Sequence, residues 1–445
     1  MKKFIDKIKD IWNIEELRNR ILLTLSLILV YRLGSFIVLP GIDPNILKQA
    51  SNMSNDGLLG LINMFAGGAF NNASIFALGV MPYISASIFM QLAGIVVPQF
   101  AKMQKEESGR EKITQITRYL TIVVTLFQSI AYITYLRTST GGAIVTDNLL
   151  FYVSTVIILT MGTLFVMWLG EKMTDKGVGN GVSILIMVGI LARLPHSLTQ
   201  EITAKIGQDK ILFLLIEFMA FIAVIMGLVM LNEGVRKIPL NYARRIIGTN
   251  AAREVGGARN FIPLKVNSAN VMPIIFAQAL MFIPSMFAGF ASGDDSGSSE
   301  WLRSLSDYTS FSYNAIYATL VILFTYFYTA LIFNPTEMAE NLKRNNSFIP
   351  GIKPGKPTAD YIGAIMDRIT LPGSLFLALA GILPGIAAFL GVTSGFASFF
   401  GGTSMLIGVA VVLDTIQQIE SYLLMRQYDG MMKTGRVSGR QPVQQ

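Results

Sequence analysis

The chain has 445 residues, of which 52% are hydrophobic and only 14% are charged, and its formal net charge is +8. Soluble proteins carry roughly 25% charged residues, so this composition indicates a membrane protein with many apolar helices. The sequence has no cysteine and a single histidine, His196. This excludes disulfides and cysteine chemistry, and it disfavours a His/Cys metal site.

The first 20 residues favour a helix that lies on the cytoplasmic membrane surface. Apolar residues recur there at helical spacing between lysines: Phe4, Ile5, Ile8, Ile11 and Trp12. This amphipathic pattern suits the membrane interface. The apolar run over residues 21–39 is longer than the core of about 7–15 residues in a cleavable signal peptide, and no cleavage pattern follows it. We therefore expect it to be the first membrane span.

Hydropathy predicts ten spans of about 20 residues each. They cover residues 21–39, 74–97, 119–136, 150–170, 178–194, 212–231, 271–290, 313–333, 373–390 and 404–424. Basic residues gather in cytoplasmic loops, and with both termini inside, 29 of the 36 basic residues fall on that side. Removing the short fifth span would place the most basic loop outside, so the charges favour ten spans.

The spans divide into two halves of five. Val80-Met81-Pro82 near the start of the second span recurs as Val271-Met272-Pro273 at the start of the seventh. An odd number of spans per half gives the halves opposite orientations, as in inverted-repeat membrane proteins. The expected organisation is an amphipathic segment (1–20), a first half (21–194), an external hinge loop (195–211), a second half (212–424) and a cytoplasmic tail (425–445), with large cytoplasmic loops at 233–267 and 334–371.

One outside segment, residues 57–68, is apolar but too short to cross the bilayer. Exposed backbone is not tolerated in lipid, so we expect a re-entrant piece or a short helix inside a protein cavity. The alternative is a surface loop with several leucines, which is disfavoured because such a run would leave an apolar patch in water.

No catalytic or nucleotide-binding motif is evident, so neither an enzyme nor a cofactor is expected. Gly177-Val178-Gly179-Asn180-Gly181 does not fit G-x-G-x-x-G, and Gly355-Lys356-Pro357-Thr358 is not a Walker loop. Glu217, Asp414 and Arg32 are ionisable residues within or beside spans. An unpaired charge at a helix centre costs about 2.5–3.5 kcal/mol, and a structural role near an interface is favoured for the two acids. A channel or passive conduit is therefore preferred to an ion-coupled transporter.

Several long segments, spread in order over almost the whole chain, match one known family. They are Arg32-Leu33-Gly34-Ser35-Phe36, Leu39-Pro40-Gly41-Ile42-Asp43, Ile62-Asn63-Met64-Phe65-Ala66-Gly67-Gly68-Ala69, Ser74-Ile75-Phe76-Ala77-Leu78-Gly79-Val80-Met81-Pro82-Tyr83-Ile84-Ser85-Ala86-Ser87-Ile88, Gly177-Val178-Gly179-Asn180-Gly181, Pro263-Leu264-Lys265-Val266-Asn267, Phe333-Asn334-Pro335 and Phe400-Gly401-Gly402-Thr403-Ser404. The chain thereby resembles the SecY family, the central subunits of the bacterial protein-translocation channel. The resemblance implies an all-α membrane protein in which ten helices form two inverted halves around a central pore with a lateral gate.

The resemblance also implies roles for individual residues. A plug over about 57–69 would include Leu61, Ile62, Asn63, Met64, Phe65, Ala66, Gly67 and Gly68. A pore ring would consist of Val80, Ile84, Val182, Ile186, Ile275 and Ile407. A lateral gate would include Met81, Pro82, Ser85, Ile88, Gln128, Met272, Pro273 and Gln278.

The pore ring agrees with local physics. Val80 and Ile84, like Val182 and Ile186, are spaced i,i+4, so each pair lies on one side of its helix. A ring of aliphatic side chains can block ions by dewetting. Aliphatic i,i+4 pairs in membrane helices are nevertheless usually packing contacts, so the ring assignment depends on the resemblance.

The resemblance implies partners as well. These are SecE and SecG small subunits, the SecA motor ATPase, the ribosome, signal sequences and nascent polypeptides, and membrane lipids, with the chain in the bacterial inner membrane. Motor and ribosome docking would use the basic residues Arg244, Arg245, Lys343, Arg344, Lys353 and Lys356. Ordinary positive-inside charge explains the number of basic residues but not the length of their loops.

Two departures from the family pattern affect docking. Lys353 stands where the family usually has arginine, and it lacks arginine's planar bidentate fork. The loop tip at 249–261 is longer than usual and lacks the usual tyrosine before its paired glycines, so individual contacts there are not transferred.

Two other functional classes remain as alternatives. A secondary transporter with inverted repeats would need polar ligands at broken helices near the midplane. An intramembrane enzyme would need a nucleophile with histidine or paired aspartates in facing helices, whereas Asp294 and Asp295 fall in an outside loop.

Overall fold

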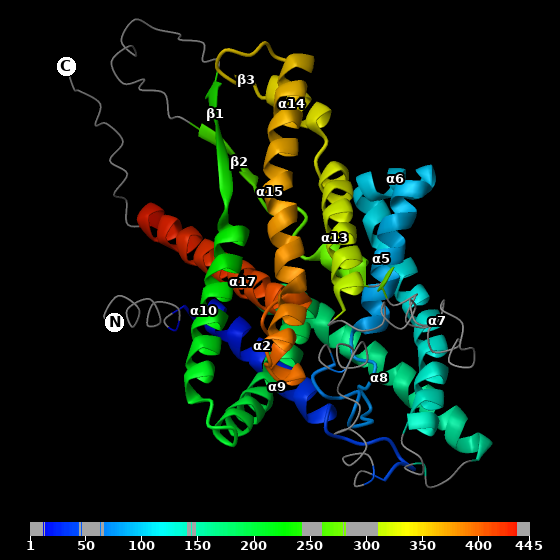
Figure 1. Cartoon of the computed structure of the whole chain (residues 1–445). Coiled ribbons are helices and arrows are strands. Elements are labelled where there is room, and N and C mark those ends of the chain that lie inside the picture. The colour runs from blue at the N-terminus through cyan, green and yellow to red at the C-terminus, as the bar shows by residue number, and fades with distance from the viewer. Residues whose placement is uncertain are drawn as a thin grey trace, which may run out of the picture. The chain divides into compact units, whose positions relative to one another are not determined.

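The computed structural model describes residues 14–43, 66–139, 148–242, 260–278, 280–281 and 310–433, and the single positions 12, 46, 63 and 144. These residues are mainly helical (Figure 1). The chain forms two compact units, of which unit 1 comprises Met1–His196 and Val411–Gln445, and unit 2 comprises Ser197–Ala410. Each unit is described by itself below.

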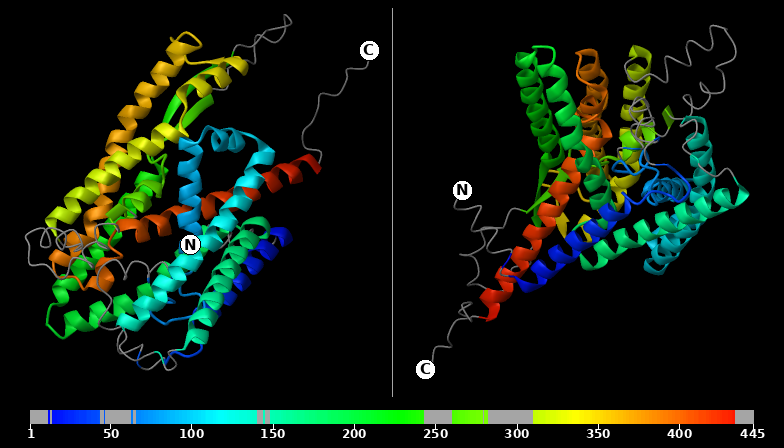
Figure 2. Two further views of the ribbon diagram at one scale, coloured as in Figure 1. Left: turned by 90° about the vertical axis from the view of Figure 1, so that its right-hand side faces the viewer. Right: turned by 90° about the horizontal axis from the view of Figure 1, so that it is seen from below.

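Unit 1 is a group of apolar helices. It contains α2 (Glu15–Gly34), α5 (Met81–Val96), α6 (Pro98–Lys105), α7 (Glu107–Ser139), α8 (Leu149–Lys176), most of α9 (Gly181–Ile206) and the end of α17 (Gly402–Lys433). Proline begins α5 and α6, where its missing N–H costs no helical hydrogen bond. The helices α5, α6 and α8 all pack against α7, and α2 packs against α8 (Figure 2).

Unit 2 combines helices with a small sheet. It contains α10 (Ile211–Glu233), β1 (Val235–Tyr242), β2 (Asn260–Lys265), α13 (Phe311–Ile332), α14 (Pro335–Arg344), β3 (Ser347–Phe348), α15 (Lys356–Phe389) and α16 (Ser394–Ala397). The long helix α15 packs along α13 and against α14 and α10 (Figure 1).

The sheet joins the two large loops that the sequence places in the cytoplasm. Its strand order is β2-β1-β3 with antiparallel pairing, in which Val235 faces Lys265 and Asn241 faces Phe348. One side of the sheet packs on α14 and α15 through an apolar cluster of Ile238, Leu240, Leu264, Ile349, Ile362 and Met366. The sequence predicted loops here, and the structure shows that they form a folded lobe with strands from both.

Seven of the described helices are long and apolar enough to cross a membrane, by length and composition alone. They cover the third, fourth, fifth, sixth, eighth, ninth and tenth predicted spans. The first span corresponds to α2, which begins earlier and ends at Gly34. The helix α5 has only 16 residues because residues 74–80 form turns. The seventh predicted span is described only as far as residue 281, and residues 272–278 of it are helical.

The loop expected over 195–211 is largely helical. The helix α9 continues through Pro195 to Ile206, and only residues 207–210 separate it from α10. A proline inside a helix removes one backbone hydrogen bond, which is tolerated in apolar helices when neighbouring groups satisfy the freed carbonyl. Polar residues after Pro195 made this stretch resemble a loop in sequence, but in the structure Glu201 and Lys205 are buried.

Candidate functional site

The chain between α2 and α5 folds back as a series of turns. Its described residues 66–80 include no helix, but backbone hydrogen bonds tie them to the residues that follow α2. Leu39 N–H donates to the Ala73 carbonyl at 2.9 Å, and Ile75 N–H donates to the Ile37 carbonyl at 3.0 Å. The segment therefore returns into unit 1 and does not form a solvent-exposed loop.

This segment contains the second part of the predicted plug. Ala66 and Gly67 are buried, and Asn63 is fully buried, with its side-chain oxygen accepting from the Asn71 N–H at 3.1 Å. Gly67 and Gly68 have φ values of +64° and +88°, a region that glycine enters without steric cost. The other predicted plug residues lie outside the described part of the chain: Leu61, Ile62, Met64 and Phe65.

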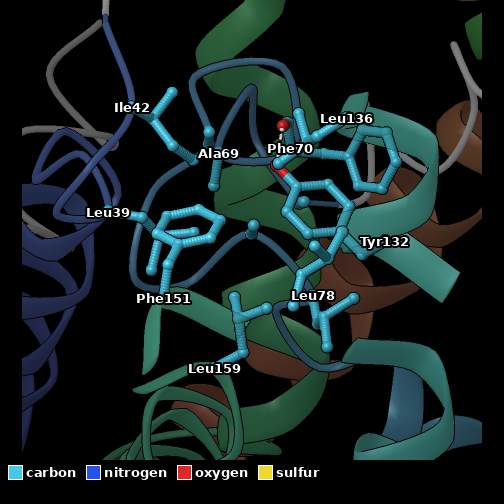
Figure 3. Packing of buried hydrophobic residues seen from close by; sticks show 13 residues of the cluster. Leu39, Ile42, Ala69, Phe70, Leu78, Tyr132, Leu136, Phe151 and Leu159 are labelled. Atoms are coloured by element: carbon cyan, nitrogen blue, oxygen red, sulfur yellow. Dashed lines mark hydrogen bonds between the residues drawn. The ribbon is translucent and has the colours of Figure 1, made fainter. Parts of the chain in front are cut away.

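An apolar cluster anchors the same segment on α7 and α8 (Figure 3). Phe70 packs against the ring of Tyr132, with 4.7 Å between centroids, and the Tyr132 hydroxyl donates to the Phe70 carbonyl at 2.6 Å. The same carbonyl also accepts from the Ala73 N–H at 3.2 Å, so the hydroxyl adds a side-chain bond to a backbone turn. The cluster consists of Leu39, Ile42, Ala66, Ala69, Phe70, Ala73, Ala77, Leu78, Tyr132, Ile133, Leu136, Phe151 and Leu159.

The described end of the plug lies directly against α9. A Cβ atom on Gly67 would come within 2.9 Å of the Gly189 Cα atom, so only hydrogens fit between the two backbones there. Gly189 follows the predicted ring residue Ile186 by less than one helical turn. A Cβ on Gly79, the residue before Val80, would contact the Ala66 Cα atom at 3.7 Å. The described end of the predicted plug therefore lies beside both elements of unit 1 that carry predicted ring residues.

The six predicted ring residues lie on four elements, two in each unit. Val80 is the N-cap of α5 and accepts a backbone hydrogen bond from Ile84, which places both on one side of that helix. Val80, Ile186 and Ile407 are buried. The remaining three are half-buried: Ile84, Val182 and Ile275.

The glycine-rich turn between α8 and α9 is clamped by side chains from three helices. Thr24 of α2 accepts from the Val178 N–H at 3.2 Å, and Gln418 of α17 accepts from the Gly179 N–H at 2.9 Å. Thr174 of α8 accepts from the Gly181 N–H at 2.9 Å. The Gly181 amide is one that a helix start leaves unpaired, and the bonds to Val178 and Gly179 hold the turn before α9. The sequence analysis found this motif but assigned it no role.

The glycines of that turn are required by close packing. A Cβ on Gly181 would lie 2.0 Å from the Gly170 carbonyl oxygen, and Gly179 has a φ of +80°. Because Val182 follows directly, the packing of this turn positions the first predicted ring residue of α9.

The predicted gate residues are found on three helical segments. Met81, Pro82, Ser85 and Ile88 lie on α5, and Gln128 lies on α7, which packs against α5 within unit 1. Ser85 is exposed and its hydroxyl donates to the Met81 carbonyl at 3.1 Å. The remaining three lie on the helical stretch 272–278 of unit 2: Met272, Pro273 and Gln278.

Four of the predicted docking residues lie at the lobe of unit 2 that contains the sheet. Lys343 and Arg344 end α14, while Lys353 and Lys356 flank the start of α15, and all four are exposed. Gly351 and Gly355 between them have φ values of +82° and +103°, so the glycines allow the turn that presents Lys353. Arg244 and Arg245 lie outside the described residues.

A buried ion cluster in unit 2 was not predicted from sequence. Lys205 of α9 lies 2.8 Å from Glu217 of α10 and 3.6 Å from Glu201, and its ammonium donates to the Gly391 carbonyl at 2.9 Å. Glu201 accepts from both the backbone N–H and the hydroxyl of Thr393. The cluster therefore joins the α9–α10 hairpin to the loop after α15. The i,i+4 spacing of Glu201 and Lys205 could have indicated an ion pair, but such pairs are typical of exposed helix surfaces and do not predict a buried cluster.

The comparisons with known proteins agree with this arrangement. The SecY family profile matches residues 74–416. The chain belongs to the SecY family. "Protein translocase subunit SecY" of Streptomyces galbus is 43% identical over 94% of this chain and 97% of its own length. The protein of the same name from Halalkalibacterium halodurans is 43% identical over 96% and 99%, and that of Escherichia coli K12 is 41% identical over 95% and 96%.

Solved structures share the SecY fold with this chain. One described as "The structure of a protein conducting channel" has a TM-score of 0.62 at 16% identity and covers 91% of this chain and 92% of its own. Another, "Sec61 in the Canine ribosome-channel complex from the endoplasmic reticulum", has a TM-score of 0.59 at 16% identity with the same coverage. The predicted fold class, a multi-pass helical membrane protein of the SecY type, is confirmed.

Proposed function

We propose that this protein is the central subunit of a protein-conducting channel, which passes unfolded secretory polypeptides across the membrane and releases membrane helices into lipid. The observation that carries the proposal is the apolar segment packed against α9 at Gly67 and Gly189, in a member of the SecY family. A segment that returns into the helices without crossing is suited to seal a pore. As a family of translocase subunits, SecY proteins are not enzymes, in agreement with the prediction from sequence.

The aliphatic residues would form the constriction of this channel. The proposed lining consists of Val80, Ile84, Val182 and Ile186 of unit 1 and of Ile275 and Ile407 of unit 2. A narrow ring of such side chains excludes ions by dewetting. Branched aliphatic side chains offer no strong polar contact, so they can surround a passing chain of any sequence without retaining it.

Release into lipid would occur at a gate between the second and seventh helices. These helices carry the repeated Val-Met-Pro sequence at Val80 and Val271. Pro82 is the second residue of α5, and Pro273 is likewise the second residue of the helical stretch 272–278. The shared sequence supports equivalent roles for the two helix starts in the inverted halves.

The driving force would come from a partner. We propose that SecA or the ribosome docks on the cytoplasmic lobe, where Lys343, Arg344, Lys353 and Lys356 are exposed, together with Arg244 and Arg245. Clustered lysines and arginines attract RNA phosphates or acidic protein surfaces. SecE-type and SecG-type small subunits would complete the channel in the bacterial plasma membrane, with both termini of this chain in the cytoplasm.

Reconstitution tests the proposal against a solute transporter. Vesicles containing this chain, its small subunits, SecA and ATP should protect a signal-bearing precursor from added protease. A precursor with a defective signal serves as the matched control and should stay accessible. The proposal would be wrong if no precursor were protected, and uptake of a small solute instead would support the transporter alternative.

A further inference from the structure

Arg32 is a charged residue in the first membrane helix, and it is half-buried. Its guanidinium donates a hydrogen bond to the Gly67 carbonyl at 2.8 Å. It also lies over the ring of Phe36, 4.8 Å from the ring centroid. The guanidinium therefore makes two contacts: a hydrogen bond to the backbone of the plug segment and a cation–π contact with Phe36.

Gly67 is held between this guanidinium and α9. A Cβ at Gly67 would lie 3.3 Å from the Arg32 terminal nitrogen and 2.9 Å from the Gly189 Cα atom. The two contacts act together, because the hydrogen bond fixes the carbonyl while the glycine pair lets the backbones approach. The Gly67 peptide is thereby placed beside the helix turn that carries Ile186.

Other anchors of the segment hold its later residues. Tyr132 bonds the Phe70 carbonyl, and backbone bonds from Leu39 and Ile75 fix residues 73 and 75. These groups are neutral, and Leu39, Ala73 and Tyr132 belong to the buried cluster on α7 and α8. The hydrogen bond from Arg32 holds Gly67, which precedes the residues held by the other anchors. Because the guanidinium is half-exposed, water can replace the Gly67 carbonyl as its hydrogen-bond partner.

We propose that Arg32 is a positioning residue that latches the plug in the closed channel by holding Gly67 against α9. The inference rests on the proposed channel function. Opening would break the single charged hydrogen bond at Gly67 while the cluster around Phe70 keeps the base of the segment in place. Arginine suits this role because its planar fork can stack on Phe36 while it donates to the carbonyl.

The latch can be tested by chloride efflux from vesicles that contain the complete channel complex without precursor. Arg32→Gln should raise the resting leak roughly tenfold, the factor that corresponds to losing a hydrogen bond to a charged group. Arg32→Lys keeps the charge and one donor and should recover much of the closure. Arg18→Gln removes the same charge from the same helix away from the plug, and it should leave the leak unchanged.

Deletion of residues 57–67 separates this inference from the proposed function. The deletion should raise the leak by itself, and Arg32→Gln should add nothing in that background, since no plug remains to be latched. A leak unchanged by the deletion would contradict the channel proposal. If the deletion raised the leak but Arg32→Gln did not, only the latch would be overturned. The same would follow if Arg32→Gln raised the leak equally in the full-length chain and in the deletion variant.

A second variant and a second measurement guard against poor folding of Arg32→Gln. Phe36→Leu keeps the charge but removes the ring beneath the guanidinium, and it should give a smaller leak than Arg32→Gln. The sequence contains no cysteine, so Ala69→Cys provides a single reporter at a fully buried position of the segment. Its labelling by an impermeant maleimide should rise with Arg32→Gln and with Phe36→Leu. Unchanged labelling and leak in both variants would overturn the latch.

Discussion

The two units hold their irregular segments by different physical means. In unit 1, hydroxyl, amide and guanidinium groups bind the backbone of the plug segment and of the turn before α9. In unit 2, the described loop after α15 is held by buried ions, Glu201, Lys205 and Glu217. Single hydrogen bonds contribute separately and can be exchanged one at a time. A buried ion cluster fails as a whole, because losing one partner leaves another charge unpaired.

This difference corresponds to what each region has to do. The plug segment has to leave its site during translocation under the proposed function, so its contacts should be breakable. The hairpin between α9 and α10 has no such role in the proposal, and its ion cluster makes it rigid. The following substitutions test this contrast.

The largest effect is expected for Lys205→Met. It would leave Glu201 and Glu217 buried near each other without their cation, and removing one partner of a buried ion pair costs about 3–5 kcal/mol. Thermal unfolding of the purified protein in detergent measures the loss. Glu217→Gln is the matched control and should cost much less, because two carboxylates face one ammonium and neutralising one also removes repulsion. Equal losses from both variants would contradict the cluster model.

Gly181→Ala should have the next largest effect, at the turn before α9. Its Cβ would lie 2.0 Å from the Gly170 carbonyl oxygen, so α9 must shift, and overpacking costs about 1–3 kcal/mol. The shift would move Val182 and should raise chloride leak as well as lower the unfolding temperature. Gly363→Ala in α15, where the nearest atom to the Cβ is 3.8 Å away, should change neither measurement appreciably. A normal leak with Gly181→Ala would argue against the turn as a determinant of the ring.

A pair of identical substitutions compares the two units directly. Thr393→Val removes a hydroxyl bonded to the Glu201 carboxylate, and Thr24→Val removes one bonded to the Val178 amide. Hydrogen bonds to charged groups contribute about 1.5–3 kcal/mol and neutral ones about 0.5–1.5 kcal/mol. Denaturant unfolding should therefore show a larger loss for Thr393→Val. The reverse order would remove the distinction between charged and neutral anchoring.

The smallest effect on stability is expected for Lys353→Glu, at the proposed docking surface on the lobe of unit 2. The side chain is exposed, and surface substitutions usually stay within about 0.5 kcal/mol. Binding to SecA or to ribosomes should nevertheless weaken, and more so at low salt, where charges are less screened. Lys112→Glu reverses an exposed charge on α7 of unit 1 and should leave binding unchanged. Equal weakening by both would show that net charge, and not this lobe, governs docking.

Several features of the protein could be derived from local sequence. The apolar runs predicted the spans that became α7, α8, α10 and α13, because each run satisfies the length of the bilayer by itself. The segment at 57–68 was predicted to be non-spanning for the same reason, and of it the structure describes residues 63 and 66–68. The i,i+4 spacing of Val80 and Ile84 placed them on one side of α5, as the structure shows.

Other features depend on contacts between distant residues. The i,i+4 spacing of Glu201 and Lys205 was only a weak signal that α9 continues past Pro195 to Ile206, because the partners that bury Lys205 lie on α10 and after α15. The pairing of β1 with β3 joins two loops separated by several helices. Hydropathy is calculated for each segment separately, so it cannot predict which distant segments pair.

The sequence by itself thus determined the family, the membrane class and most of the apolar helices. Only the tertiary structure decided how the irregular segments are held: Arg32 on Gly67, Gln418 on Gly179, and Glu217 on Lys205. The physical reason is the range of the interactions. Helix formation in a bilayer is governed by neighbours within one or two turns, whereas a buried carbonyl, amide or charge has to be satisfied by whichever distant side chain the fold brings to it.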